Sequence, residues 1–364
     1  MKAAVIGGGS WGTAFAVYLG RIGIPTRLWI REPDVFEAAR RDRENPVFLP
    51  GHRFPEAVSV HQEIGQAMDG AEAVFVAVPS QHCRQIYSRM SPYCEEGQAV
   101  ISLTKGIEKR TLLRMSEVMG EVFDSETRPS VGVLSGPSFA REVAEGHPTA
   151  LILASRDSGS AGRLQHRLSS PSLRVYTTRD VAGVEVAGAL KNIIAIAAGI
   201  LDAMAFGHNA LASLITRGLA EIARLGIKLG ARRDTFAGLA GLGDLVLTCT
   251  GPLSRNRRVG RELGAGRRLS EVLAGARMVA EGIPTTVSAR ELAKKKGVEM
   301  PITEQVYQVL CRKKPPRRAL ADLMARELRS ETDGFEYKFQ HFMNRFRGGQ
   351  RPSEGASSKI RGRP

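Results

Sequence analysis

The chain has 364 residues, of which 43% are hydrophobic, and it carries a formal net charge of +15 at pH 7. This length favours two domains, and the hydrophobic share is ordinary for a globular protein with a buried core. The positive charge is spread along the chain in short clusters, and no nucleic-acid-binding module with interleaved aromatic residues is visible. We expect no specific nucleic-acid partner, because a composition biased toward arginine accounts for the charge.

Two further classes of protein are disfavoured. The apolar run at residues 193–200 is shorter than the roughly 20 residues that cross a bilayer, so no transmembrane segment is expected. The cysteines have neither metal-like nor redox-like spacing and no signal peptide is visible, which favours a reducing cytoplasm and no metal site. These cysteines are Cys83, Cys94, Cys249 and Cys311.

The N-terminus predicts a dinucleotide-binding turn. Residues 2–6 have the pattern of a short strand, and the sequence GGGSWG follows, in which Gly7, Gly9 and Gly12 satisfy G-x-G-x-x-G. In such a turn the first glycine permits the tight bend, the second lets a pyrophosphate approach the backbone, and the third lets helix and strand pack closely. The motif alone is common, but its place between a strand and the helix-compatible residues 13–20 favours cofactor binding at the helix N-terminus.

The second strand, predicted at residues 26–30, ends where a dinucleotide fold reads the adenosine ribose. Here Arg31 is followed by Glu32. An acid at this place binds a 2′-hydroxyl and an arginine accommodates a 2′-phosphate, so the order favours NADP(H) while leaving NAD(H) open. The alternative is that Arg31 is only a solvated strand end.

Further strands are predicted in alternation with helix-compatible segments, which indicates βα units around a parallel sheet. Ligands of such sheets bind outside the carboxyl ends of the strands, and Lys105 and the sequence SGPS at residues 135–138 lie there. The predicted strands are 73–80, 99–106, 131–138 and, as an extension of the domain, 149–155.

From about residue 184 the sequence becomes helical in pattern. Residues 210–230 have helical apolar spacing, and residues 183–200 are apolar nearly all round, which predicts a central buried helix. Lys191 lies in the middle of that helix. A buried lysine is costly unless it is paired or has lost its proton, so Lys191 is a candidate acid or base; the alternative is a lysine whose stem reaches out to water.

Two adjoining stretches carry polar groups suited to a substrate. Residues 240–250 form a glycine-rich turn with one acid, Asp244, in apolar surroundings, for which a helix cap is the alternative. Ser254, Arg255 and Asn256 offer a hydroxyl, a planar guanidinium and an amide within three residues, which suits a phosphate monoester. The alternative for the arginines is a solvated basic face.

These stretches together resemble the bacterial-type NAD(P)-dependent sn-glycerol-3-phosphate dehydrogenases. The resemblance runs in family order from residue 1 to about residue 328. It is carried most specifically by SGPSFA, GALKN, GLGDL and SRNRR, with FLP at 48–50 and VAEG among the other matching stretches.

The resemblance implies an α/β fold with an N-terminal Rossmann-like domain (1–183) and a C-terminal all-α domain (184–330). The implied activity is reversible NAD(P)H-dependent reduction of dihydroxyacetone phosphate to sn-glycerol 3-phosphate, which supplies glycerophospholipid synthesis. A homodimer is also implied. Residues 331–364 fall outside the resemblance and are expected to be a basic, largely disordered extension, in which residues 335–346 could form a short amphipathic helix.

The resemblance also assigns site residues. Lys191 becomes the proton donor during reduction and the acceptor in reverse, with Lys105 and Asp244 in the same pocket and Asn192 as a second group able to hold its ammonium. The implied substrate contacts are Lys105, Gly136, Ser138, Lys191, Asp244, Ser254, Arg255 and Asn256. The implied cofactor contacts are Gly7, Gly9, Ser10, Trp11, Gly12, Arg31, Lys105, Ala140, Arg255, Val279 and Glu281.

Three other functions are weighed against this one. A related β-hydroxyacid or 6-phosphogluconate-type dehydrogenase also places a lysine on the connecting helix, but SRNRR and GLGDLVLTCT favour a small phosphate ester. A dinucleotide sensor without turnover is disfavoured because Lys105, Lys191 and Asp244 are all present. A basic nucleic-acid-binding protein lacks its module.

Overall fold

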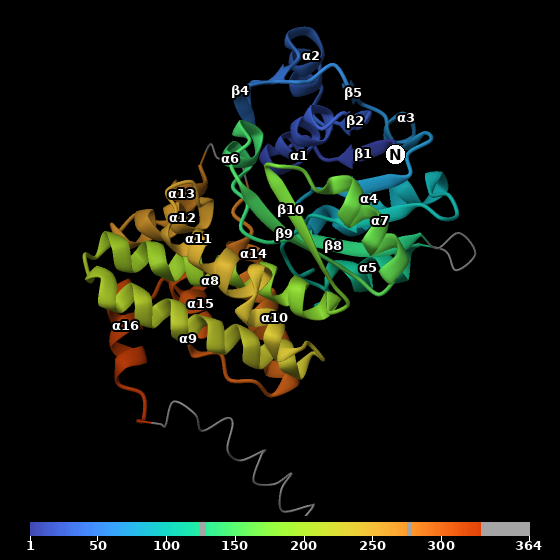
Figure 1. The fold of residues 1–364 in the computed structure, drawn as a ribbon. Helices are drawn as coiled ribbons and strands as arrows, with labels where there is room; N and C mark the ends of the chain where they lie inside the picture. Colours follow the sequence, from blue (N-terminus) through green and yellow to red (C-terminus); the bar gives the residue numbers. More distant parts are fainter. Residues whose placement is uncertain (124–128, 275–278, 329–364) are drawn as a thin grey trace, which may run out of the picture. The chain divides into compact units, whose positions relative to one another are not determined.

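The first half of the chain forms a sheet with helices on both faces (Figure 1). The computed structural model describes residues 1–123, 129–274 and 279–328. Within them the sheet strands are β1 (Ala3–Ile6), β2 (Thr26–Trp29), β5 (Val58–His61), β6 (Ala73–Val76), β7 (Ala99–Ser102), β8 (Ser130–Ser135), β9 (Thr149–Ser155) and β10 (Leu173–Thr178). A separate two-stranded sheet pairs β3 (Glu44–Asn45) with β4 (Leu49–Arg53).

The strand order is β10-β9-β8-β7-β6-β1-β2-β5. The strands from β5 to β8 are parallel, β8 and β9 are antiparallel, and β9 and β10 are again parallel. The chain leaves β1 toward β2 and later returns on its other side at β6. This reversal of order is the place where doubly wound folds bind dinucleotides.

Strand periodicity divides the first half into two apolar layers. In β1, Ala3 and Val5 face one cluster while Ala4 and Ile6 face the other. Because successive side chains point to opposite faces, a strand buried on both faces reads as a continuous apolar run. The helices that cover the sheet are α1 (Ser10–Arg21), α2 (Pro33–Asp42), α3 (Ile64–Met68), α4 (Cys83–Met90), α5 (Met115–Val122), α6 (Ala140–Glu145) and α7 (Ser158–Leu168).

All six predicted strands are present, and the described residues contain four more strands that were not predicted. The apolar strands end within about four residues of the expected bounds. The missed strands are β3, β4, β5 and β10. They are short or half exposed, so their sequences lack a continuous apolar run; β10, at the edge of the sheet, exposes Arg174 and Tyr176.

The second half is built around α8 (Val181–Ala203), as the apolar residues 183–200 predicted. Its cluster of buried apolar side chains forms the core of this half. The helices around it are α9 (Gly207–Lys228), α10 (Arg233–Ala237), α11 (Asp244–Thr250), α12 (Arg255–Gly264), α13 (Leu269–Leu273), α14 (Gly282–Lys296), α15 (Pro301–Arg312) and α16 (Pro316–Met324), with a π-helical turn, η3 (Leu239–Gly243), before α11.

The length of α8 corrects the argument from length, but not the expectation that the chain has no clear transmembrane segment. The apolar run at residues 193–200 was expected to be too short for a membrane span, yet α8 has 23 residues and is long and apolar enough by composition. Of the most apolar 18-residue stretch of α8, 89% is buried inside the protein, as in the core helix of a globular domain. Protein atoms therefore surround most of this helix.

Residues 1–323 form one compact unit in which the sheet and the helical half are in contact. The boundary predicted between residues 183 and 184 falls in the first turn of α8, and the division into two domains stays a prediction. The predicted extension, residues 331–364, lies outside the described residues.

Candidate active site

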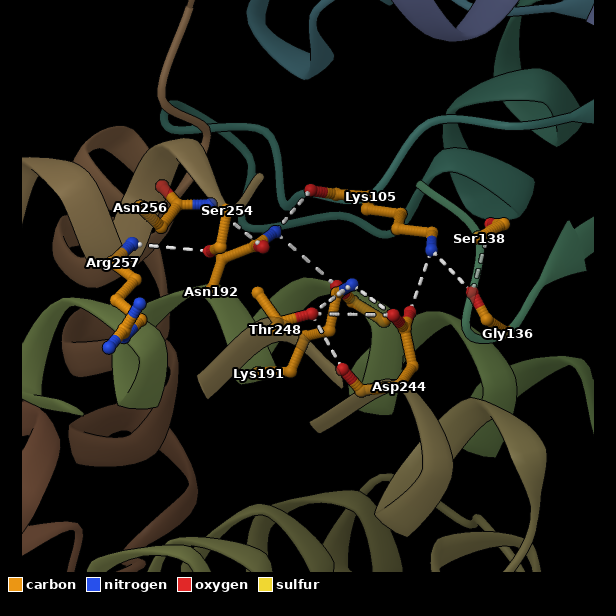
Figure 2. A network of polar contacts seen from close by, with 11 residues as sticks. Lys105, Gly136, Ser138, Lys191, Asn192, Asp244, Thr248, Ser254, Asn256 and Arg257 are labelled. Carbon is orange, nitrogen blue, oxygen red and sulfur yellow. Dashed lines mark hydrogen bonds and ion pairs between the residues drawn. The ribbon is translucent and has the colours of Figure 1, made fainter. Parts of the chain in front are cut away.

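The charged centre of the site is formed by side chains from both halves of the chain. Lys105 follows β7, Lys191 lies on α8, and Asp244 is the first residue of α11. Asp244 bridges the two lysines, because Lys191 Nζ donates to its Oδ1 and Lys105 Nζ donates to its Oδ2 at 2.7 Å (Figure 2). Asp244 is 1% exposed and Lys191 is 6% exposed, so this bridge is shielded from water.

The end of β8 contributes to the same network. Lys105 Nζ also donates to the Gly136 carbonyl at 3.0 Å, and the Ser138 hydroxyl donates to that carbonyl at 3.0 Å. Gly136 has φ +129°, a region that L side chains rarely adopt, so a glycine is needed for this turn. The predicted strand-end residues Lys105, Gly136 and Ser138 are therefore brought together with Lys191 and Asp244.

One residue of this network was missed by the sequence analysis. Lys191 Nζ donates to Thr248 Oγ1 at 2.8 Å, and that hydroxyl donates to the Asp244 carbonyl at 2.6 Å. Thr248 lies four residues after Asp244, which places both on one face of α11. That spacing in the sequence DLVLTCT was the available signal.

The surroundings of Lys191 lower its pKa to about 7. Burial is the largest cause, because a low-dielectric environment disfavours the ammonium, and the nearby Lys105 acts in the same direction. The Asp244 carboxylate opposes both by stabilising the ammonium. Lys191 can therefore hold or release a proton near neutral pH. Because Lys191 is buried, the alternative that its side chain reaches out to water is wrong.

Asn192 has a different role from the one expected. Its amide nitrogen donates weakly to the carbonyls of Lys105 and Gly188, at 3.5 and 3.4 Å, and its oxygen accepts from Asn256 Nδ2 at 2.9 Å. The Asn256 oxygen in turn accepts from the Gly282 amide at 2.9 Å. Asn192 thus ties α8 to α12 and α14 instead of holding the Lys191 ammonium.

The start of α12 adjoins this network. Ser254 is the N-cap of α12 and its hydroxyl accepts from the Arg257 amide at 3.2 Å, while Arg255 is exposed and donates weakly to the Val279 carbonyl at 3.4 Å. A helix N-terminus carries partial positive charge and N–H groups without helical partners. The predicted set Ser254, Arg255 and Asn256 therefore lies at an anion-attracting helix end.

Glycines permit the close helix contacts that hold these groups together. A Cβ on Gly199 of α8 would lie 2.0 Å from the Arg257 carbonyl, and one on Gly260 of α12 would lie 2.0 Å from the Ile196 carbonyl. A Cβ on Gly188 would lie 2.9 Å from Ser135 Oγ. The backbones of α8 and α12 approach where side chains are absent, and this sets the place of the α12 N-terminus.

The turn between β1 and α1 has the features of a dinucleotide cradle. Gly7 has φ +125°, and a Cβ on Gly12 would lie 2.0 Å from the Gly7 carbonyl, so both positions need glycine. A Cβ on Gly9 would meet no atom within 4 Å, which leaves open space beside the helix N-terminus at Ser10. The indole N–H of Trp11 is buried without a hydrogen-bond partner. These residues fit a bound dinucleotide pyrophosphate.

The remaining predicted cofactor contacts lie on several different elements. Ala140 begins α6 and packs with Trp11 on one apolar cluster, and Glu281 accepts from the Ser80 amide and hydroxyl at 2.8 and 2.6 Å. Val279 is exposed before α14. Arg31 follows β2, is exposed, and is paired with Glu32 at 2.6 Å; the structure does not bring it into the lysine network.

Comparison with known proteins identifies the family. A family model described as NAD-dependent glycerol-3-phosphate dehydrogenase N-terminus matches residues 2–161, and its C-terminus counterpart matches residues 180–321. The chain belongs to the NAD-dependent glycerol-3-phosphate dehydrogenase family.

Relatives of this family match nearly the whole chain. The glycerol-3-phosphate dehydrogenase [NAD(P)+] of Koribacter versatilis is 51% identical over 91% of this chain and 98% of its own length. That of Geobacter sulfurreducens is 50% identical over 91% of this chain and 98% of its own length. The crystal structure of glycerol-3-phosphate dehydrogenase from Coxiella burnetii superposes with a TM-score of 0.86 at 39% identity, covering 89% of this chain and 99% of that one.

Family membership establishes the reaction class. The protein is an oxidoreductase that uses NAD or NADP and interconverts dihydroxyacetone phosphate and sn-glycerol 3-phosphate. The resemblance stated from the sequence is confirmed, as are the Rossmann-like N-terminal half and the helical C-terminal half.

Proposed function

We propose that Lys191 is the proton donor to the C2 oxygen when dihydroxyacetone phosphate is reduced, and the proton acceptor when sn-glycerol 3-phosphate is oxidised. The observation that carries this role is the shielded bridge of Lys191, Asp244 and Lys105, in which the pKa of Lys191 lies at about 7. A group with a pKa near the working pH serves both directions of proton transfer.

Lys105 and Asp244 have separate roles beside Lys191. Lys105 Nζ donates to Asp244 and Gly136 and retains some exposure, so it can turn toward the substrate oxygen and stabilise charge there. The Asp244 carboxylate accepts from both ammonium groups. Together with the Thr248 hydroxyl, it fixes the orientation of the Lys191 side chain. Ser138 and the Gly136 carbonyl complete the wall that positions the glycerol carbons.

The substrate phosphate is assigned to the N-terminus of α12. Ser254, Arg255 and Asn256 lie there, and an exposed guanidinium beside free helix N–H groups suits a phosphate dianion. The side-chain amide of Asn256 is already bonded to Asn192 and Gly282, so it ties the phosphate end of the site to the proton-transfer end.

The cofactor is assigned to the β1–α1 turn and the strand ends beside it. NAD(P)H bound there would supply the hydride for C2. The chain would hold it through the turn, through Arg31 at the ribose and through Glu281 and Lys105 near the reacting end. The full set is Gly7, Gly9, Ser10, Trp11, Gly12, Arg31, Lys105, Ala140, Arg255, Val279 and Glu281.

The proton-transfer role is tested by pH–rate profiles of wild type and Lys191→Ala. Reduction needs protonated Lys191, so kcat/KM for dihydroxyacetone phosphate should fall as pH rises through about 7, and kcat/KM for oxidation should rise through the same region. In the variant, kcat/KM should be about 10³-fold lower in both directions, and its pH dependence at about 7 should disappear. A variant that keeps the wild-type rate and profile contradicts the role of Lys191, and Lys105 then becomes the candidate.

The preference for NADPH over NADH is proposed from Arg31 and tested separately. The Glu32 carboxylate pairs with the Arg31 guanidinium at 2.6 Å, so a 2′-phosphate must compete with this carboxylate for the guanidinium. Arg31→Ala should raise the KM for NADPH about tenfold and leave the KM for NADH within twofold, because only NADPH carries the 2′-phosphate. Equal effects on both cofactors contradict the preference.

Two further assignments are proposed. We expect a homodimer, which the resemblance implies and which light scattering on the purified chain measures directly. We also expect residence in the cytoplasm, because the free cysteines, without metal-like or redox-like spacing, favour a reducing compartment.

A further inference from the structure

The chain contains a buried amide that contacts the glycine-rich turn from outside the motif. Asn45 lies in the short strand β3 and is 0% exposed. Its Nδ2 donates to the Gly8 carbonyl at 2.8 Å and to Thr13 Oγ1 at 3.0 Å, while its Oδ1 accepts from the Phe48 amide at 3.0 Å. One side chain thus connects the β3–β4 hairpin to the turn between β1 and α1.

The contact with Gly8 fixes the orientation of a peptide plane. A trans peptide is planar, so the Gly8 carbonyl and the Gly9 N–H point in opposite directions. Asn45 holds the Gly8 carbonyl on the buried side, and the Gly9 N–H is thereby directed to the other side. A Cβ on Gly9 would meet no atom within 4 Å, so there is open space next to this residue for a ligand.

The turn needs such a restraint because glycines permit many backbone conformations. Gly8 also packs closely against Ile30, since a Cβ on Gly8 would lie 2.7 Å from the Ile30 Cγ1 atom. Thr13 Oγ1 also donates to the Gly8 carbonyl, at 3.2 Å. The Gly8–Gly9 peptide is therefore held by packing against Ile30 and by two buried donors, Asn45 and Thr13.

We propose that Asn45 is a positioning residue for cofactor binding, which keeps the Gly9 N–H aimed at the pyrophosphate of the dinucleotide. The inference rests on the proposed placement of the cofactor at this turn. It accounts for the stretch around FLP at residues 48–50, to which no role is otherwise given: Phe48 anchors the Asn45 oxygen, and Leu49 packs against Ala14 of α1 and Ala144 of α6.

The test compares Asn45→Asp with Asn45→Ala. Asn45→Asp keeps the shape and the oxygen that accepts from Phe48, but it replaces the donor to Gly8 and Thr13 by an acceptor, so it removes both contacts made by Nδ2 and places a carboxyl at a buried site. Both variants should raise the dissociation constants of NADPH and NADH by the same factor, about tenfold, because both cofactors carry the pyrophosphate. The KM for dihydroxyacetone phosphate at saturating NADPH should stay within twofold.

Two probes locate the effect. Calorimetric titration measures the affinity for two fragments of the cofactor. The affinity for ADP-ribose, which carries the pyrophosphate, should fall by the same factor as that for NADPH. The affinity for adenosine 2′-monophosphate, which lacks the pyrophosphate, should not change. In the protein without cofactor, amide hydrogen exchange across residues 7–13 should become faster in both variants.

Two control variants separate the possible failures. Gln98→Ala removes another buried amide that donates to a backbone carbonyl, that of Ala71 at 2.7 Å, before β7 and away from the turn; it should leave cofactor affinity unchanged. Gly9→Val places a side chain in the proposed pyrophosphate space and should weaken NADPH. The inference is overturned if Gly9→Val weakens NADPH binding while the Asn45 variants, like Gln98→Ala, lose only thermal stability. If Gly9→Val also has no effect, the placement of the cofactor is wrong, and the inference fails with it.

Discussion

Lys191 shows how one residue type takes its function from its surroundings. In water its ammonium would hold a proton far above neutral pH. Burial on α8 and the neighbouring Lys105 lower its pKa to about 7, while Asp244 keeps it from falling further. The sequence indicated a lysine in an apolar helix, and the opposing effects of desolvation and the carboxylate decide where its proton is released.

Thr248 offers a prediction at the same scale. Its hydroxyl accepts from the Lys191 ammonium at 2.8 Å, so Thr248→Val removes an acceptor that stabilises the charged form. The pKa of Lys191 should fall, the alkaline limit of reduction should move to lower pH, and kcat for reduction above neutral pH should drop about tenfold. The pH dependence of kcat/KM measures this shift.

Thr250 provides the matched control for that experiment. It lies on the same helix and its hydroxyl donates to the carbonyl four residues back, that of Val246, at 2.8 Å, but it is exposed and does not contact Lys191. Thr250→Val should leave the profile unchanged. A wild-type profile in Thr248→Val would show that the hydroxyl does not influence the Lys191 proton.

At the scale of elements, the site depends on how closely two helices approach. Gly199 of α8 and Gly260 of α12 let the two backbones meet, and the crossing places the N-terminus of α12 beside Asn192. Helices in contact through ordinary side chains lie about 8–10 Å apart, and glycines at the contact permit a shorter approach. The phosphate end of the site is thus positioned by residues that carry no functional group.

Gly199→Ala tests this dependence. The added Cβ would lie 2.0 Å from the Arg257 carbonyl, so α12 must move, and we expect a loss of about 1–3 kcal/mol in the free energy of unfolding. Because the N-terminus of α12 moves with it, the KM for dihydroxyacetone phosphate should rise more than the KM for NADPH. Urea unfolding and steady-state kinetics measure the two effects.

The control is an exposed glycine within a helix. Gly162 lies in α7, and a Cβ there would meet no atom within 4 Å. Gly162→Ala should stabilise the protein by about 0.5–1 kcal/mol, because alanine loses less backbone entropy in a helix, and should leave both KM values unchanged. If Gly199→Ala behaves in the same way, the close crossing does not position the phosphate site.

At the scale of the whole molecule, the active-site proton is coupled to stability. The folded pKa of Lys191, about 7, lies below the ordinary value of 10.5 for the unfolded chain. Between these two pH values the unfolded chain binds one more proton at this residue than the folded chain does. The contribution of Lys191 to stability is therefore least favourable below about pH 7 and improves as pH rises toward 10.5.

This coupling predicts a measurable difference between wild type and Lys191→Met, which keeps the length of the side chain and removes the titrating group. From pH 7.5 to 9.5 the free energy of unfolding of wild type should rise relative to that of the variant, with a slope of at most about 1.4 kcal/mol per pH unit. Urea titrations at several pH values give the slope. A difference that does not change with pH would show that the folded and unfolded pKa values of Lys191 are alike.

Features encoded in contiguous residues could be predicted from the sequence. The glycine-rich turn between a strand and a helix, the buried strands and the apolar helix around Lys191 each have a local pattern that backbone geometry translates directly. The short or exposed strands β5 and β10 have no such pattern, because pairing with strands distant in sequence stabilises them. The hairpin of β3 and β4 pairs locally, but its strands are short and lack an apolar run.

The sequence by itself determined which residue types are present at the ends of strands and on the central helix, together with the family to which they belong. Only the tertiary structure decided which of them meet. Asp244 lies 53 residues from Lys191 and 139 from Lys105, and Asn45 lies 37 residues from the Gly8 carbonyl that it holds. The physical reason is that hydrogen bonds, burial and the resulting pKa depend on distance in space, which the fold sets and local periodicity does not.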